Sequence, residues 1–141
     1  MKSYFILFLA LMTSCAAVKP GLEGQVMWIS GNQMPGPAKK PTSGEGVERE
    51  VLIYEVLTTE DVMTSNGFIT QVNKPLIQTV HTNKHGAFTV KLKPGTYSLL
   101  VKEPRGLFAN RYDQYNHIQP ITVQAGERTK VTLIIDYEAA Y

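Results

Sequence analysis

Residues 82–101, TNKHGAFTVKLKPGTYSLLV, decide the fold class of this 141-residue chain. Apolar and polar side chains alternate over residues 88–92 and again over residues 97–101. A period of two is typical of β-strands that bury one face. Pro94 and Gly95 separate the two runs and suit a tight turn, because proline fixes φ and glycine tolerates positive φ. The pattern therefore predicts one β-hairpin over residues 88–101.

The rest of the chain contains further short segments with strand character. They are Leu22–Ile29, Glu48–Leu57, Phe68–Asn73, Leu76–Thr82, Ile121–Val123 and Thr129–Tyr137. Turn residues separate these segments, and none shows a sustained helical period. We expect a loop or one helical turn capped by Thr59 over residues 58–66, and a frayed tail over residues 138–141. About seven short strands of this kind predict an all-β fold, an antiparallel β-sandwich.

Two stretches depart from the strand pattern. Gly24 lies inside the first predicted strand, where glycine indicates a bulge or the close approach of another group. Ser30–Gly46 is rich in glycine and proline, so a long flexible loop is expected there. A mobile insertion is the preferred interpretation of this loop, and a binding loop is the alternative.

The first residues have the features of an export signal. Lys2 precedes an apolar run over residues 4–12 that is too short to span a bilayer. The run ends at Thr13-Ser14-Cys15, which resembles the lipobox of bacterial lipoproteins, and the chain has no other cysteine. The resemblance implies a signal peptide over residues 1–14, lipidation of Cys15, and a lipidated tether over residues 15–21 that anchors the protein to a membrane. An ordinary secretory signal with an incidental Cys15 is the alternative.

Composition limits the classes of partner. Fourteen basic and twelve acidic residues give a formal net charge of +2. Basic residues do not gather into a dominant run, so a nucleic-acid-binding surface is not expected.

A resemblance to a known family rests on the motif TN..G.F.V.L.PG.Y.L over residues 82–99. This motif resembles the signature of the carboxypeptidase regulatory-like domains, which are also called transthyretin-like or prealbumin-like. Gly24-x-Val26 and Ile121-x-Val123-x-x-Gly126 are similar to the start and the end of such domains. The resemblance implies a seven-stranded antiparallel Greek-key β-sandwich over residues 22–138. Together with the lipobox, the chain looks like the small envelope lipoproteins of Bacteroidetes-type bacteria.

The activities known for this fold do not match the residues present. Transthyretin-related hydroxyisourate hydrolases end in Tyr-Arg-Gly-Ser, whereas this chain ends in Tyr137-Glu-Ala-Ala-Tyr. Intradiol dioxygenases need a His-x-His pair, which the residues around His117 do not form. Isopeptide-forming modules need a lysine on the first strand and an asparagine on the last, and both are absent from the predicted segments. We therefore expect no catalytic residue and no enzyme activity.

Metal and cofactor chemistry also lacks support in the sequence. His81 and His85 have a spacing of four, which joins metal ligands on a helix but not across a strand end and a turn. Asp113 and Glu103 are interpreted as isolated carboxylates, and Glu60-Asp61 as side chains that point apart or cap a turn. We expect no metal site and no cofactor.

The most suggestive segment for ligand binding is the connection over residues 105–117. It holds two arginines, two tyrosines and a histidine: Arg105, Arg111, Tyr112, Tyr115 and His117. Such residues at the end of a rigid sandwich can stack on a sugar ring or hold a carboxylate. The preferred interpretation is plainer, with Tyr112 and Tyr115 covering the open end of the core and the arginines in solvent.

These observations predict a non-catalytic cell-envelope lipoprotein that acts as an accessory or interaction module through strand edges and end loops. The alternative is a carbohydrate- or peptide-binding protein with its site on residues 105–117. The expected partners are a membrane, through the lipid anchor, and an envelope protein or a glycan. Residues 16–21 contain no acidic run of the kind that resembles a surface-export signal. The expected location is therefore the outer membrane, facing the periplasm.

Overall fold

The computed structural model describes residues 16–37 and 42–141 and is all-β, as the sequence predicts. The expected signal peptide 1–14, its lipidation site Cys15, and residues 38–41 of the predicted loop lie outside the described residues. Residues 16–20 of the expected tether have no regular structure. The one helical element of the described chain is a single 3₁₀ turn, η1 (Thr59–Asp61). Within the described residues, the structure holds no helix of the length and apolar character needed to cross a membrane.

The described residues form thirteen strands, several of only two to four residues. They are β1 (Gly21–Asn32), β2 (Glu45–Gly46), β3 (Glu50–Glu55), β4 (Leu57–Thr58), β5 (Val62–Ser65), β6 (Phe68–Val72), β7 (Leu76–His81), β8 (Ala87–Lys91), β9 (Gly95–Glu103), β10 (Gly106–Phe108), β11 (His117–Ile118), β12 (Pro120–Val123) and β13 (Arg128–Ala140).

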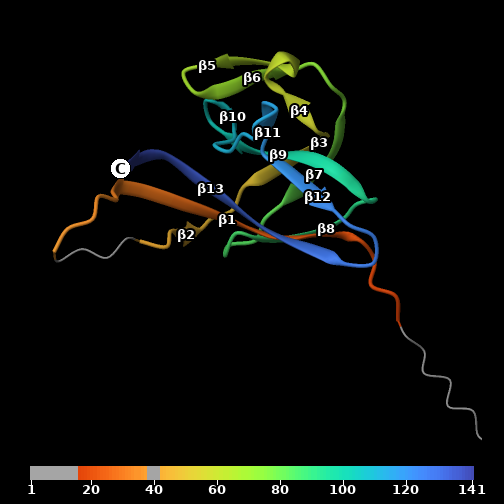
Figure 1. Cartoon of the computed structure of the whole chain (residues 1–141). Coiled ribbons are helices and arrows are strands. Elements are labelled where there is room, and N and C mark those ends of the chain that lie inside the picture. The colour runs from red at the N-terminus through yellow and green to blue at the C-terminus, as the bar shows by residue number, and fades with distance from the viewer. Residues whose placement is uncertain (1–15, 38–41) are drawn as a thin grey trace, which may run out of the picture.

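The smaller sheet is built around β1. Strand β13 lies along one side of β1, and β8 and β2 share the other side (Figure 1). The β1–β13 pair is parallel, which corrects the expectation that every pairing is antiparallel. It continues through Asn32 and Ala140 after a register shift between Trp28 and Ser30. The predicted frayed tail over residues 138–141 is therefore wrong up to Ala140, because these residues pair with the end of β1.

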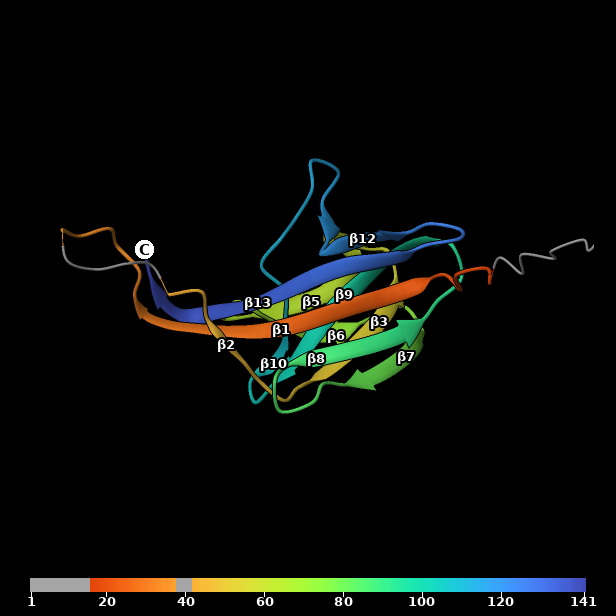
Figure 2. The ribbon, with the colours of Figure 1, turned by 90° about the horizontal axis from the view of Figure 1, so that it is seen from below.

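The larger sheet is built around β9 and β3, in the order β5-β6-β10-β9-β3-β7, with β12 also paired to β9. Its pairings are antiparallel. Figure 2 shows the pair of β1 and β13 lying across β9, β3 and β6, so the two sheets form stacked layers. The prediction of an all-β fold with stacked antiparallel sheets is thus confirmed, except for the parallel β1–β13 pair. Strand β3 is internal to its sheet, as the apolar residues on both of its faces predict.

The predicted hairpin over residues 88–101 is wrong in its pairing. Strand β8 pairs with β1 in the smaller sheet, whereas β9 pairs with β3 in the larger one. The link at residues 92–94 therefore carries the chain from one layer to the other. Both runs still point their alternate apolar side chains inward, because each layer contributes one face to the same core.

The main core lies between the two layers. Leu22 and Val26 of β1 and Ile135 of β13 meet Ile53 and Leu99 of the larger sheet, and all five are fully buried. A second cluster lies on the other face of the larger sheet, where Leu100, Leu57 and Ile118 are buried. Strand β9 is consequently buried on both faces over much of its length, including Ser98, whose hydroxyl accepts a 2.8 Å hydrogen bond from the Leu57 N–H.

Several local predictions change in detail. The cap of η1 is Thr58 and not Thr59, because the Asp61 carboxylate accepts hydrogen bonds from the Thr58 N–H and hydroxyl at 2.8 and 3.0 Å. Residues 62–65 form strand β5 in place of the predicted loop.

Gly24 marks a close approach, as expected, since a Cβ there would lie 2.3 Å from the Phe88 ring. The predicted loop over 30–46 is shorter, because β1 takes its first three residues and β2 its last two.

Candidate functional site

Residues 111–119 form a tight turn, here called the tip, that projects between β10 and β12 (Figure 2). Asp113 holds the tip together. Its Oδ1 accepts hydrogen bonds from the N–H groups of Tyr115 and His117 at 2.8 and 2.9 Å, and its Oδ2 lies 2.7 Å from His117 Nδ1. The Gln119 N–H closes the turn by donating to the Arg111 carbonyl at 2.8 Å. A side chain that bonds its own backbone in this way fixes the shape of a turn.

Electrostatics favour the ionised form of Asp113. Desolvation acts to raise the pKa of this carboxyl, but the hydrogen bonds from the His117 N–H, the His117 ring and the Tyr115 N–H outweigh it. The pKa of Asp113 therefore lies below its ordinary value. This contact also corrects the interpretation of Asp113 as an isolated carboxylate.

The tip holds two tyrosines in solvent. Tyr112 is 52% exposed and Tyr115 is 67% exposed, and the Tyr115 ring lies 6.0 Å from the His117 ring. The preferred interpretation, in which these tyrosines cover the open end of the core, is therefore wrong. The core below the tip is closed by Ile118 instead, which pairs with Leu57 and is buried. Exposed aromatic rings on an internally bonded turn can serve as a contact surface.

Arg105 does not share the tip's contacts. Its guanidinium lies over the rings of Phe68 and Tyr137, 5.1 and 5.3 Å from their centroids. This places Arg105 against the aromatic cluster of Phe68, Phe108 and Tyr137 at one end of the main core, where it covers two of the three rings. The five residues predicted as one site thus divide into the tip, with Arg111, Tyr112, Tyr115 and His117, and the separate Arg105.

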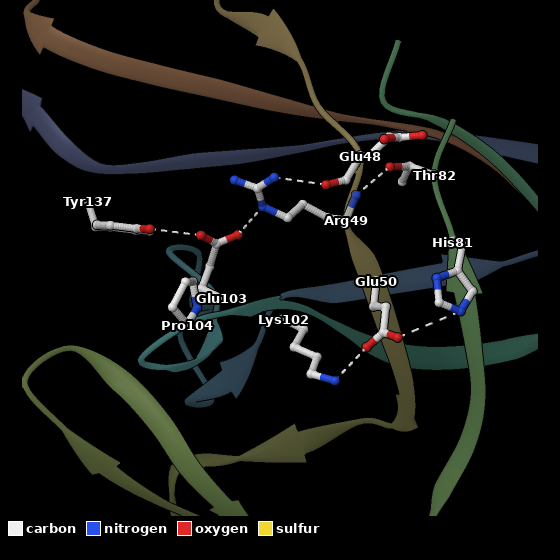
Figure 3. A pocket seen from close by; sticks show the side chains of 9 residues that line it. All are labelled: Glu48, Arg49, Glu50, His81, Thr82, Lys102, Glu103, Pro104 and Tyr137. Carbon is white, nitrogen blue, oxygen red and sulfur yellow. Dashed lines mark hydrogen bonds and ion pairs between the residues drawn. The ribbon is translucent and has the colours of Figure 1, made fainter. Parts of the chain in front are cut away.

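An open pocket of about 770 Å³ lies at the ends of β3, β7 and β9 (Figure 3). Its lining includes three glutamates, Glu48, Glu50 and Glu103, with the cations Arg49 and Lys102, and also His81, Thr82, Pro104 and Tyr137. The three carboxylates exceed the two permanent cations by one negative charge. The pocket as a whole therefore favours a cationic group over an anionic one.

The inner wall of the pocket joins the two layers through Glu103. The side chain of Glu103 is 1% exposed, and its Oε1 lies 2.5 Å from Arg49 Nε. Its Oε2 accepts a 2.8 Å hydrogen bond from the Tyr137 hydroxyl of the opposite sheet. Figure 3 shows Glu103 between these two partners. A buried carboxylate needs such partners, and the expectation that Glu103 is isolated is corrected.

The outer wall of the pocket is a row of cross-strand neighbours. Glu50 of β3 lies between Lys102 of β9, at 2.8 Å, and His81 of β7, at 3.7 Å (Figure 3). The hydrogen bond from Lys102 holds the pKa of Glu50 below its ordinary value. Glu48 differs from these residues, since its exposed carboxylate points away from the Arg49 guanidinium in Figure 3 and makes no ion pair with another described residue.

Sequence reasoning missed the pocket because its residues come from four distant segments. One local signal was present. Glu103 continues the inward series that includes Leu99 and Val101, and a carboxylate in an inward series needs a buried partner. Within residues 16–37 and 42–141, no group of three or more histidine, cysteine, aspartate or glutamate side chains is arranged to hold a metal ion.

The fold and these surfaces define a β-rich protein of stacked, mainly antiparallel sheets, with an exposed aromatic tip and an open charged pocket. Neither a protein-family model, a curated protein nor a solved structure matches the chain.

Proposed function

We propose that this chain is a non-catalytic lipoprotein of a bacterial cell envelope, in which a transthyretin-like Greek-key β-sandwich acts as an accessory or interaction module. The observation that carries the proposal is the tip, where an internally bonded turn holds Tyr112 and Tyr115 in solvent. Tyrosine is favoured at protein interfaces because it buries a large apolar ring and keeps a polar end. Because Asp113 already orders the turn, little conformational entropy is lost when a partner binds.

The motif over residues 82–99 and the two stacked sheets support the transthyretin-like assignment. The seven main strands of such a sandwich would be β1, β3, β7, β8, β9, β12 and β13, with β2, β4, β5, β6, β10 and β11 as additions. The lipobox supports lipidation at Cys15, which would place the sandwich at the outer membrane facing the periplasm. An envelope protein is the proposed partner.

A carbohydrate- or peptide-binding protein is the second candidate. The exposure of Tyr112 and Tyr115 beside Arg111 favours it, because an aromatic ring can stack on a sugar and a guanidinium can bind its hydroxyl or carboxylate groups. The tip does not line the pocket between the strand ends, so a ligand there would bind to an open surface.

A capture experiment in cross-linked cells tests the proposal. Tagged full-length protein is compared with Tyr112→Ala/Tyr115→Ala, with Cys15→Ala and with Met63→Ala, a matched control that removes another exposed apolar side chain. One envelope protein should be recovered with the wild type and with Met63→Ala, and lost with the double tyrosine variant. Capture that is equal in all four forms would exclude the tip as the contact surface.

Glycan binding by the purified protein in detergent distinguishes the second candidate. Binding to a glycan that needs both tyrosines, without a captured protein, would support the carbohydrate-binding function and replace the first proposal. Cys15→Ala should move the protein from the membrane fraction to the soluble fraction, which tests the lipid anchor separately.

A further inference from the structure

Strand β7 is an open edge of the larger sheet. It pairs with β3 on one side, and no strand of the described chain pairs with its other side. Figure 2 shows β7 at the margin of the molecule, beyond β3. An edge of this kind presents backbone N–H and C=O groups that another extended chain can bind.

The register shows which backbone groups of β7 point outward. The Thr82 N–H donates to the Arg49 carbonyl at 2.9 Å, and the pairing continues through Glu50 opposite His81. In an antiparallel pair, successive residues point their hydrogen-bonding groups alternately toward the partner and away from it. The backbone groups of Val80 therefore point toward β3, whereas those of Thr79 and His81 point away from it, to the open side of the strand.

Apart from a bulge at Ile77, this edge lacks the usual protection against added strands. Natural edges commonly carry lysine, proline or inward-pointing charge, and the sequence of β7, LIQTVH, holds none of these. Its one irregularity is a register shift opposite Ile77, before the regular stretch that ends at His81. Leu76 and Ile77 are 47% and 44% exposed, so the start of the strand also offers apolar side chains.

The carboxyl end of β7 leads into the open pocket. His81 and Thr82 line that pocket together with Glu48, the carboxylate that has no ion pair among the described residues. A strand that pairs with the open side of β7 would bring the side chain of its end residue to the pocket, next to His81 and Glu48. Because the pocket carries an excess of one negative charge, a lysine or arginine side chain is favoured there.

We propose that β7 binds an extended peptide segment of a partner by strand addition, with a lysine or arginine of that segment in the pocket beside Glu48. The segment runs antiparallel to β7, since antiparallel pairs are the commoner kind, and its amino end therefore carries the cation. The proposal rests on the proposed function as an interaction module but uses a surface other than the tip.

A second copy of the chain fits this edge less well. Pairing of two β7 strands about Thr79 would bring Leu76 and Pro75 of one copy toward the pocket of the other. The nearest cation is Lys74, whose ammonium group is held by Asp61 at 3.2 Å and by the Val56 carbonyl at 2.8 Å. In this register, the described residues of a second copy thus supply no free cation to the pocket.

A synthetic peptide tests the proposal with the full-length protein in detergent. The probe is the N-acetylated, dye-labelled peptide Lys-Thr-Val-Thr-Val-Thr, and its matched control begins with Glu in place of Lys. A third peptide carries N-methyl groups at alternate residues, which removes the donors needed for pairing. Fluorescence anisotropy measures binding, and amide hydrogen exchange followed by NMR shows where the peptide lies.

The lysine peptide should bind about fivefold more tightly than the glutamate peptide, and Glu48→Gln should remove this preference. The amides of Thr79 and His81 should exchange more slowly when the lysine peptide is bound, whereas that of Val80, already bonded to β3, should change little. The N-methylated peptide should not bind. Thr79→Pro, which removes an outward donor, should weaken binding at least about tenfold, with its melting temperature as the check on folding.

Unchanged exchange at Thr79 and His81 with saturating peptide would overturn the proposal, as would equal binding of the N-methylated peptide. Slow exchange at Thr79 without peptide, together with a dimer in sedimentation, would assign the edge to a second copy and also overturn it. Tyr112→Ala/Tyr115→Ala should leave peptide binding unchanged, so a failure at the edge is distinguishable from a failure of the tip.

Discussion

The Tyr137 hydroxyl of β13 donates a 2.8 Å hydrogen bond to Glu103 of β9, and this contact joins the two sheets at one end of the core. The second oxygen of Glu103 is paired with Arg49, so both oxygens of a buried carboxylate have partners. The ring of Tyr137 also packs against two other aromatic rings. Its centroid lies 5.1 Å from that of Trp28 and 4.9 Å from that of Phe68. One tyrosine thus combines aromatic packing with a polar bond between the layers.

The titration of Tyr137 follows from this contact. Burial and the bond to Glu103 raise the pKa of Tyr137 to about 12. A group whose pKa is raised by folding stabilises the folded state fully below its unfolded pKa, which is about 10 for tyrosine, and the stabilisation is lost as the pH rises through about 12. Absorbance titration should therefore show a tyrosine that ionises near pH 12 and is absent in Tyr137→Phe. Titration of all tyrosines near pH 10 would contradict this assignment.

Removing Glu103 should destabilise the protein far more than removing Glu50. Glu103→Ala leaves the Tyr137 hydroxyl and the partly exposed Arg49 without their buried partner, and we expect a loss of about 2–3 kcal/mol in the free energy of unfolding. Glu50→Ala is the matched control, because its partner Lys102 is 61% exposed, and this substitution should cost much less stability. Urea unfolding measures both, and equal losses would argue against Glu103 as a bond between the layers.

Two glycines with similar φ should differ in their tolerance of alanine. Gly86 has φ +76° and a Cβ there would lie 2.2 Å from the Val26 carbonyl oxygen, whereas Gly67 has φ +82° and open space around it. Gly67→Ala should cost about 1 kcal/mol through backbone strain alone, and Gly86→Ala about 3 kcal/mol or more, because a carbonyl group must also move. Thermal unfolding of the two variants shows which substitution costs more stability. A larger loss of stability for Gly67→Ala would show that the turn at Gly86 relaxes freely around the added methyl group.

Asp113→Ala should loosen the tip without unfolding the sandwich. The substitution removes the acceptor for the Tyr115 and His117 N–H groups. Their amide exchange should become faster, while the amides of the core strands stay protected. The matched control is Glu127→Ala, which removes an exposed carboxylate in the turn before β13. Unchanged exchange at Tyr115 and His117 would mean that other contacts order the tip.

The same tip should respond to acid. Folding lowers the pKa of Asp113, so the ionised carboxylate stabilises the ordered turn above its ordinary pKa of 3.8, and this contribution disappears as the pH falls through the lower folded value. Exchange at Tyr115 and His117 should therefore be independent of pH near neutrality, after correction for intrinsic rates, and should increase below about pH 4. An increase that already begins near neutrality would argue against Asp113 as the group that orders the tip.

Residues 88–101 show what local pattern determines in this chain. The alternation correctly predicts that Phe88, Val90, Leu99 and Val101 face the core. It does not predict the partner of either run, since a period of two identifies the buried face of a strand and not its neighbour. The partners are β1 and β3, which lie far away in the sequence, and their pairing takes β8 and β9 into different layers.

The candidate sites show the same division. Residues 111–117 were predictable because their arginine, tyrosines and histidine are adjacent in the sequence, although their exposure was not. The pocket was not predictable, because Arg49, Glu103 and Tyr137 come together only when the two layers stack. Contacts between layers depend on long-range pairing, which has no signature within a single segment.

The parallel pairing of β1 with β13 has a consequence for how the protein folds. Strand β1 is among the first segments to be synthesised. One of its two edges nevertheless stays unpaired until β13, which begins at Arg128, has been made. The smaller sheet therefore cannot be completed until β13 has been synthesised, although the strands of the larger sheet, within residues 50–123, are all made before it. Sheets that depend on such distant partners fold slowly, typically in about milliseconds to seconds. The proposed export of this protein requires an unfolded chain in transit, and the late synthesis of β13 fits that requirement.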